Sequence, residues 1–366
     1  MTKGIKKYRY DGEKKYSTKK FDTSDTGQFA DRQEAVEEFI ANLKEINKLQ
    51  QKLYAVGKEG IVFIFQAMDA AGKDGVIRTV FSTMTPHGVK EFCFKTPTSL
   101  ELSHDYLWRF WNALPARGNI SIFNRSYYED VLIGKVKLLY KNYAFPERLK
   151  DRDMIADRYV QINEFEKYLY DTGTRVVKIF LNVSKDEQAK RFISRIDTPK
   201  KNWKASVGDI KCREDWDAYM EAFEDMVNKT SSDDSPWYVV PSDHKWYSRL
   251  IVSRIVLDTL KQADPKWPHI EEDELEEIMA CRQQLVDSIA DQDILIEDTP
   301  EMFADTEKIA ASIYLDEEKD KIDAKTRKLK HQGLERLKAA KDAGVKFLGT
   351  SEIIKMIFRK ENNDNE

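Results

Sequence analysis

The sequence predicts an α/β fold in which a mostly parallel sheet is sandwiched between helices. Short apolar runs alternate with amphipathic runs over residues 31–268, and this alternation is typical of parallel sheets covered on both faces. The first apolar run, residues 61–66, stops at a loop of small residues that ends in Gly72 and Lys73. Because open parallel sheets bind ligands at the carboxyl ends of their strands, we expect the functional site at this edge.

The elements are predicted in order from their periodicity. Residues 32–54 form an amphipathic helix, and the loop after strand 60–66 runs into a helix that continues through Gly75. Further strands are expected at 89–94, 118–124, 175–181 and 237–241, and further helices at 99–113, 153–171, 185–196, 213–229 and 245–262.

Three parts are expected along the chain. Residues 1–30 are polar and rich in Tyr and Lys, which indicates an N-terminal arm. Residues 31–268 form the main domain, with a helical lid at about 185–230. Residues 269–366 form a charged helical extension, in which helices are expected at 272–290, 304–343 and 351–359.

Composition excludes several classes of protein. The chain has 366 residues, 41% hydrophobic and 34% charged, enough for a large core under a charged surface. It has no run of eighteen apolar residues and its start lacks the apolar core of a signal peptide, so we expect no membrane span. Three widely spaced cysteines give neither a disulfide framework nor a metal site. We therefore expect a cytoplasmic protein.

Charge is strongly segregated within the overall net charge of −4. Residues 190–213 hold eight Lys or Arg and two Asp or Glu, a local net charge of +6. Residues 271–320 hold eighteen acids and three bases, a net charge of −15, and residues 321–360 hold twelve bases and four acids, a net charge of +8. A polyanion is expected to bind the first of these segments and to avoid the second.

The loop after the first strand has the order of a phosphate-binding loop. Backbone amides of such a loop surround phosphate at a helix N-terminus, and a lysine reaches the terminal phosphates. The match to G-x-x-x-x-G-K-[ST] is imperfect, because Ala67 and Asp74 replace the first Gly and the Ser or Thr. Asp69 inside the loop predicts a bridging Mg²⁺ ion. We assign phosphate binding to Ala70, Ala71, Gly72, Lys73, Asp74, Gly75 and Arg78. The alternative is an ordinary strand–turn–helix with a solvated lysine.

Two other clusters carry candidate chemistry. The strand at 118–124 ends in Asn124, Arg125 and Glu129, which can orient metal or acceptor; alternatively they only cap a helix N-terminus. Arg191 and Arg195 lie four residues apart on one helix face. They precede the lid lysines Lys200, Lys201 and Lys204. Mobile basic lids neutralise phosphates, whereas the alternative is a solvated helix end.

The ordered motifs resemble the polyphosphate kinase 2 family over about residues 30–265. The matching pieces are Asp69-Ala-Ala-Gly-Lys73, Lys95-Thr-Pro-Thr98, Ser103-His-Asp-Tyr-Leu-Trp-Arg109, Phe123-Asn-Arg-Ser-Tyr-Tyr-Glu-Asp130, Arg191 to Lys204, Ser206-Val-Gly-Asp209, Trp216-Asp-Ala-Tyr-Met-Glu-Ala-Phe-Glu-Asp225 and Pro236-Trp-Tyr-Val-Val-Pro-Ser-Asp-His-Lys-Trp-Tyr247.

The resemblance implies a P-loop kinase-like fold and phosphoryl transfer between inorganic polyphosphate and nucleotides. By the same resemblance, Asp69 binds Mg²⁺, Lys95 lies on the acceptor side, and Lys73, Arg125, Arg191, Arg195 and Lys204 hold phosphates.

One departure from the family concerns the acceptor. The family commonly has Asp at the tip of the second strand, where this chain has Asn124. Together with Glu129, this resembles the subgroup that phosphorylates both nucleoside mono- and diphosphates. We therefore expect AMP and ADP as acceptors, with GMP and GDP as further candidates, and a homo-oligomer. We expect no nucleic acid partner.

Two rival functions remain open at this point. An ATP-dependent nucleotide kinase of thymidylate-kinase type shares the same fold logic and differs in its donor. A non-enzymatic polyanion- or RNA-binding protein would use the basic segment 190–213.

Overall fold

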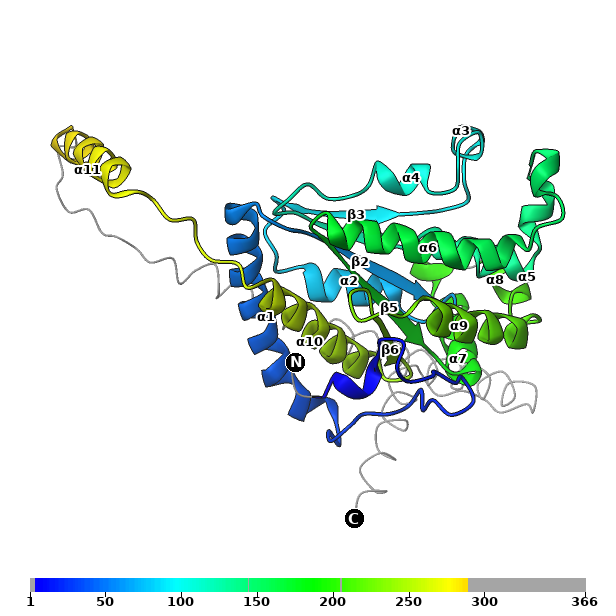
Figure 1. Ribbon diagram of the computed structural model, residues 1–366. Coiled ribbons are helices and arrows are strands. Elements are labelled where there is room, and N and C mark those ends of the chain that lie inside the picture. Colours follow the sequence, from blue (N-terminus) through cyan, green and yellow to red (C-terminus); the bar gives the residue numbers. More distant parts are fainter. Residues whose placement is uncertain (1–3, 144, 205, 289–366) are drawn as a thin grey trace, which may run out of the picture. The chain divides into compact units, whose positions relative to one another are not determined.

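The computed structural model describes residues 4–143, 145–204 and 206–288. Its centre is one six-stranded sheet in the order β1-β6-β5-β2-β4-β3 (Figure 1). All neighbouring strands are parallel except β1, which pairs antiparallel with β6 at the edge. The strands are β1 (Arg9–Tyr10), β2 (Gly60–Ala67), β3 (Val89–Cys93), β4 (Ile120–Asn124), β5 (Thr174–Asn182) and β6 (Trp237–Pro241).

Helices cover both faces of this sheet. Phe63 and Phe65 of β2 pack against Phe81 of α2 on one face. On the other face, Phe180 of β5 stacks on Phe223 of α9. The longer helices are α1 (Arg32–Val56), α2 (Lys73–Phe81), α6 (Met154–Asp171), α7 (Lys185–Ile196), α9 (Trp216–Thr230), α10 (Lys245–Ala263) and α11 (Glu272–Asp287). The α/β fold with a mostly parallel sheet is thus confirmed.

The central strand β2 is apolar and buried on both faces, as parallel strands require. Residues 61–65 are each at most 1% exposed. β2 pairs with β5 on one side and with β4 on the other, and Phe65 lies opposite Asn124. This register places the end of β2 beside the end of β4.

The region expected as one helix over 99–113 forms two short helices, α3 (Ser99–Leu102) and α4 (Trp108–Trp111). A capping box between Thr98 and Glu101 starts the first helix. The Asp105 carboxylate then accepts from the Leu107 amide at 2.9 Å, which starts a new turn. Local side-chain bonds of this kind compete with a continuous helix. The remaining short helices are α5 (Ile133–Val136) and α8 (Val207–Lys211).

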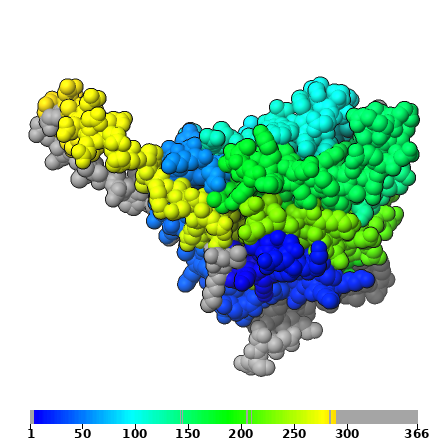
Figure 2. Space-filling model, viewed as in Figure 1, coloured from blue at the N-terminus to red at the C-terminus, as the bar shows by residue number. Residues whose placement is uncertain are grey.

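The segment expected as an N-terminal arm packs against the domain over its described residues. Its strand β1 extends the sheet beside β6, and Ile5, Tyr8 and Tyr16 are buried. Figure 2 shows the N-terminal segment, in dark blue, lying against the yellow-green surface. The Thr18 amide donates to Glu224 of α9 at 2.7 Å.

At the C-terminal side, α11 matches the acidic helix expected from residue 272. The helices expected at 304–343 and 351–359 lie outside the described residues. No helix among the described residues is both long and apolar enough to cross a membrane.

Candidate active site

The phosphate-binding loop connects the end of β2 to the start of α2. The Ala71 amide donates to the Met68 carbonyl at 3.2 Å, closing a tight turn. Ala70 and Gly72 have positive φ angles of 62° and 110°, a backbone conformation that is costly for a residue other than glycine. Gly72 precedes α2 and offers no side-chain cap, so the first amides of the helix are available to an anion.

Lys73 is buried at the first position of α2. Its side chain is 8% exposed, and its Nζ donates to the Ala67 carbonyl at 3.1 Å. Burial lowers the pKa of Lys73, and the Arg125 guanidinium lowers it further, while the carboxylates of Asp69, Glu129 and Asp74 oppose this shift. The lysine therefore lies among acids without a carboxylate partner of its own among the described residues.

The tip of β4 brings Arg125 to the same place. The Arg125 amide donates to the Phe65 carbonyl at 3.1 Å, and its φ of 67° turns the chain sharply out of the strand. Nη2 of Arg125 donates to Oδ1 of Asp69 at 2.5 Å, and its Nη1 lies 3.6 Å from Oε2 of Glu129. One guanidinium thus joins the predicted metal-binding carboxylate to the predicted acceptor carboxylate.

Glu129 lies in the 3₁₀ turn Tyr127–Asp130 that follows Arg125. Burial raises the pKa of Glu129, against the lowering effects of Arg125 and Lys73. With its amide turned to satisfy both neighbours, Gln66 donates to Oε1 of Glu129 at 2.9 Å and accepts from the Ser126 amide at 3.1 Å. Gln66 was not predicted as a site residue, although a polar residue inside a buried strand is the kind of signal that marks one.

The side-chain amide of Asn124 bridges two carboxylates. Its Nδ2 donates to Oδ1 of Asp74 and to Oε1 of Glu91, both at 3.1 Å. Glu91 lies on the neighbouring strand β3, and only the strand register reveals that it belongs to the site. An amide suits this position because a carboxylate would repel both acids.

Helix α7, which belongs to the predicted lid, forms hydrogen bonds with the predicted phosphate-binding loop. Arg191 donates through Nη1 to the carbonyls of Ala70 and Ala71, at 3.2 and 2.6 Å, and through Nη2 to the Asp243 carbonyl at 3.0 Å. Gln188, one turn earlier, donates to the Asp69 carbonyl at 2.8 Å. Arg191 is thus brought into the site, but it contacts loop carbonyls and its guanidinium is only 8% exposed.

Four other predicted residues are Arg78, Lys95, Arg195 and Lys204. Arg78 and Lys95 are exposed, and among the described residues neither forms a hydrogen bond or ion pair with the loop. The Arg195 guanidinium lies 5.3 Å from the centre of the Phe192 ring. Lys204 ends a 3₁₀ turn, Pro199–Lys204, and its side chain lies outside the described part of the chain.

The acids of this site suit a magnesium ion that substrate helps to hold. Within the described ranges, no group of three or more His, Cys, Asp or Glu is arranged to bind a metal. Mg²⁺ in phosphoryl-transfer sites is commonly held by one or two carboxylates together with substrate phosphates. Asp69, whose side chain is 29% exposed beside the loop, fits that role.

Comparison with known proteins identifies relatives over most of the chain. The sequence model of the family described as polyphosphate kinase 2 (PPK2) matches residues 29–268. The ADP-polyphosphate phosphotransferase of Rhodopseudomonas palustris is 47% identical over 246 residues, 67% of this chain and 85% of that protein. The AMP/ADP-polyphosphate phosphotransferase of Meiothermus ruber is 42% identical over 268 residues, 73% of this chain and 97% of that protein.

A solved structure agrees with these sequence matches. The crystal structure of polyphosphate kinase 2 from Arthrobacter aurescens TC1 superposes with a TM-score of 0.70 at 38% sequence identity. The match covers 78% of this chain and 96% of that one.

Proposed function

The chain belongs to the polyphosphate kinase 2 family, and from this premise we propose that it transfers a phosphoryl group from inorganic polyphosphate to a nucleoside mono- or diphosphate. The observation that carries the proposal is the meeting of Lys73, Asp69 and Arg125 at the tips of the adjacent strands β2 and β4. A buried cation, a carboxylate and an anion-binding helix N-terminus are the parts that phosphoryl transfer requires.

In the transfer step, a terminal phosphate oxygen of the acceptor attacks the end phosphorus of polyphosphate. The new P–O bond forms as the bond from that phosphorus to the bridging oxygen breaks, and the shortened polyphosphate leaves with the electron pair. Lys73 and Arg125 offset negative charge on the transferring group, and the loop amides orient it. Positioning and charge suffice, so the enzyme forms no covalent intermediate.

Magnesium is the cofactor we assign. When bound, it would neutralise phosphate oxygens of donor and acceptor, and Asp69 is the residue that would hold it. The Asp69 carboxylate already accepts from Arg125, so the guanidinium holds it at the mouth of the loop.

The acceptor side is formed by Asn124 and Glu129. Asn124 brings no charge, and its amide is bound to Asp74 and Glu91. Glu129 lies one turn further on, is partly buried and has a raised pKa. We propose that this arrangement admits both AMP and ADP, with GMP and GDP as further candidates. The basic residues of the lid, Arg195 first among them, would attract the polymeric donor.

A ³¹P NMR time course tests this function. Protein, Mg²⁺ and polyphosphate are mixed with AMP or ADP in the absence of ATP, and the β- and γ-phosphate signals of the products should grow. Lys73→Ala should abolish this growth. Lys58→Ala, which removes an exposed lysine near the opposite end of β2, should leave it unchanged.

Two results would refute the proposal. Turnover with ATP as the only effective donor would favour a nucleotide kinase of thymidylate-kinase type. Polyphosphate binding without turnover, and insensitive to Lys73→Ala, would favour a polyanion-binding protein.

We further propose a cytoplasmic homo-oligomer in which residues 31–268 carry the chemistry. The family match ends at residue 268, and every assigned residue precedes it. The opposite charges of segments 271–320 and 321–360 suit pairing within or between chains, which favours a role of the extension in assembly. A chain that ends at Pro268 should keep its turnover. Light scattering should show fewer chains per particle than for the full-length protein. A folded but inactive truncation would contradict this division.

A further inference from the structure

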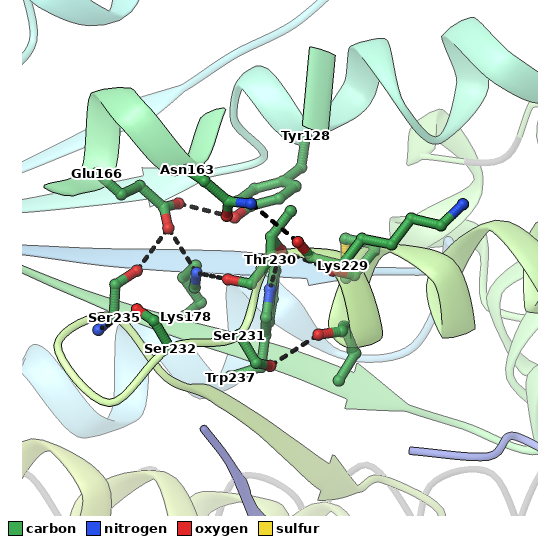
Figure 3. Close-up of polar contacts among 12 residues, drawn as sticks. Tyr128, Asn163, Glu166, Lys178, Lys229, Thr230, Ser231, Ser232, Ser235 and Trp237 are labelled. Atoms are coloured by element: carbon green, nitrogen blue, oxygen red, sulfur yellow. Dashed lines mark hydrogen bonds and ion pairs between the residues drawn. The ribbon is translucent and has the colours of Figure 1, made fainter. Parts of the chain in front are cut away.

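A second ionic cluster lies buried between β5 and α6 (Figure 3). Lys178 of β5 is 0% exposed and Glu166 of α6 is 2% exposed. Nζ of Lys178 donates to Oε2 of Glu166 at 2.5 Å and to the Thr230 carbonyl at 2.6 Å. Two charges buried this deeply carry a large desolvation cost, and the proposed phosphoryl transfer does not use them.

Each oxygen of the Glu166 carboxylate accepts two hydrogen bonds. Oε2 accepts from Lys178 and from the Ser235 hydroxyl. Oε1 accepts from the hydroxyls of Tyr127 and Tyr128, at 2.8 and 2.7 Å. Burial raises the pKa of both tyrosines, and Glu166 raises it further, so both hydroxyls remain protonated donors.

These two tyrosines begin the turn that carries the acceptor side of the site. Tyr127 and Tyr128 follow Arg125 by two and three residues, and Glu129 comes next. Arg125 has the left-handed backbone conformation, which persists only where surrounding contacts enforce it. The two hydrogen bonds from the tyrosine hydroxyls to Glu166 supply such contacts.

We propose that Glu166 is a positioning residue for phosphoryl transfer, an inference that rests on the proposed function. Its carboxylate fixes the turn that carries Arg125 and Glu129 through two tyrosine hydroxyls, and the hydrogen bond from Lys178 holds that carboxylate in place. A buried ion pair is a poor source of stability compared with apolar residues of similar size. Its advantage here is that one acceptor, the Glu166 carboxylate, fixes the positions of two donors, the hydroxyls of Tyr127 and Tyr128.

The first test removes only the hydroxyls. Tyr127→Phe, Tyr128→Phe and the double variant keep the ring packing and withdraw one or both donors from Glu166. We expect the double variant to lower kcat by about tenfold or more, since small displacements of catalytic groups are costly. The KM for polyphosphate should stay within about twofold, because the donor side is held by other residues.

Tyr159→Phe is the matched control. Tyr159 lies on the same helix as Glu166 and is 4% exposed, and its hydroxyl has no hydrogen-bond partner among the described residues. Loss of this hydroxyl should leave kcat unchanged.

The second test separates positioning from stability. Glu166→Leu combined with Lys178→Met replaces the ion pair with apolar side chains, which restores or exceeds the stability of each single variant. We expect the double variant to fold and still show the reduced kcat. Recovery of both stability and kcat would overturn the inference, as would a Tyr127→Phe/Tyr128→Phe variant with normal kcat. Wild-type protein without polyphosphate turnover would instead refute the proposed function.

Discussion

Two buried lysines on neighbouring parts of the sheet have opposite surroundings. Lys178 lies in β5 with a carboxylate at 2.5 Å and a carbonyl at 2.6 Å. Lys73 lies at the start of α2, after the loop that follows β2, and donates to one carbonyl at 3.1 Å. Burial lowers the pKa of both. Only Lys178 has its charge balanced directly by a carboxylate of the protein.

The acids around Lys73 are bound to other donors. Asp69 accepts from Arg125, Asp74 accepts from Asn124, and Glu129 lies beside Arg125 and Gln66. Under the proposed function, the positive charge of Lys73 is therefore available to a phosphate, whereas that of Lys178 is balanced by Glu166. A buried lysine thus marks a binding site when the acids near it bond to other groups.

Among the substitutions considered, removal of Lys73 should have the largest effect on activity. Lys73→Met should lower kcat/KM with polyphosphate by about 10³-fold or more, because a charge that stabilises the transition state is lost. Stability should not fall, since a costly buried charge disappears. Steady-state kinetics and urea unfolding measure the two effects, and near-normal turnover would refute the role of the loop.

Removal of Lys178 should lower the stability of the fold, which removal of Lys73 should not. Lys178→Met leaves Glu166 buried without its cation and should reduce the free energy of unfolding by about 3–5 kcal/mol. Lys229→Met is the control, because Lys229 is 50% exposed beside Asp225 and surface pairs contribute about 0–1 kcal/mol. Equal urea midpoints for the two variants would contradict the larger stability loss expected from breaking the buried pair.

Asp130 extends the comparison to an incompletely paired carboxylate. Burial raises its pKa to about 6 from 3.8, with Arg158 opposing the shift from a distance of 3.8 Å. The folded state therefore binds the Asp130 proton more tightly than the unfolded state does. The contribution of protonated Asp130 to the free energy of unfolding is complete below pH 3.8 and is lost as the pH rises through 6. Asp130→Asn should prevent this loss of stability, because an amide does not ionise.

We expect Asp130→Asn to be more stable than the wild type by about 2 kcal/mol at pH 7.5, with the difference shrinking toward pH 4. Urea unfolding at the two pH values measures this. A difference that does not change with pH would contradict the assignment to Asp130.

Glu129 should give the smallest and most selective effect. Glu129→Ala removes the partly buried carboxylate beside Arg125 and should lower kcat/KM by about 10- to 100-fold, by unequal factors for AMP and ADP. Separate assays with each acceptor at saturating Mg²⁺ measure the ratio. Use of ADP with no trace of AMP use by the wild type would refute the dual acceptor range and leave the kinase function standing.

Local patterns predicted most of the fold and part of the site. The strand at 60–66 and its loop are visible because small residues follow an apolar run, and Asn124, Arg125 and Glu129 follow from the neighbouring strand tip. Glu91 and Gln188 were missed because only the strand register and the lid packing bring them in. Lys178 lies within an apolar strand run. A lysine at such a position indicates a buried acidic partner, which the structure identifies as Glu166.

The bridging amide of Asn124 couples three positions through one set of hydrogen bonds. Its single nitrogen donates to both Asp74 and Glu91. Replacing that amide with a carboxylate would gather three acids within hydrogen-bonding distance, a change that like-charge repulsion opposes. Asparagine and aspartate at this position are therefore not freely exchangeable in this background. We therefore expect an Asn124→Asp exchange to be better tolerated when residue 74 or 91 is changed to a neutral residue as well.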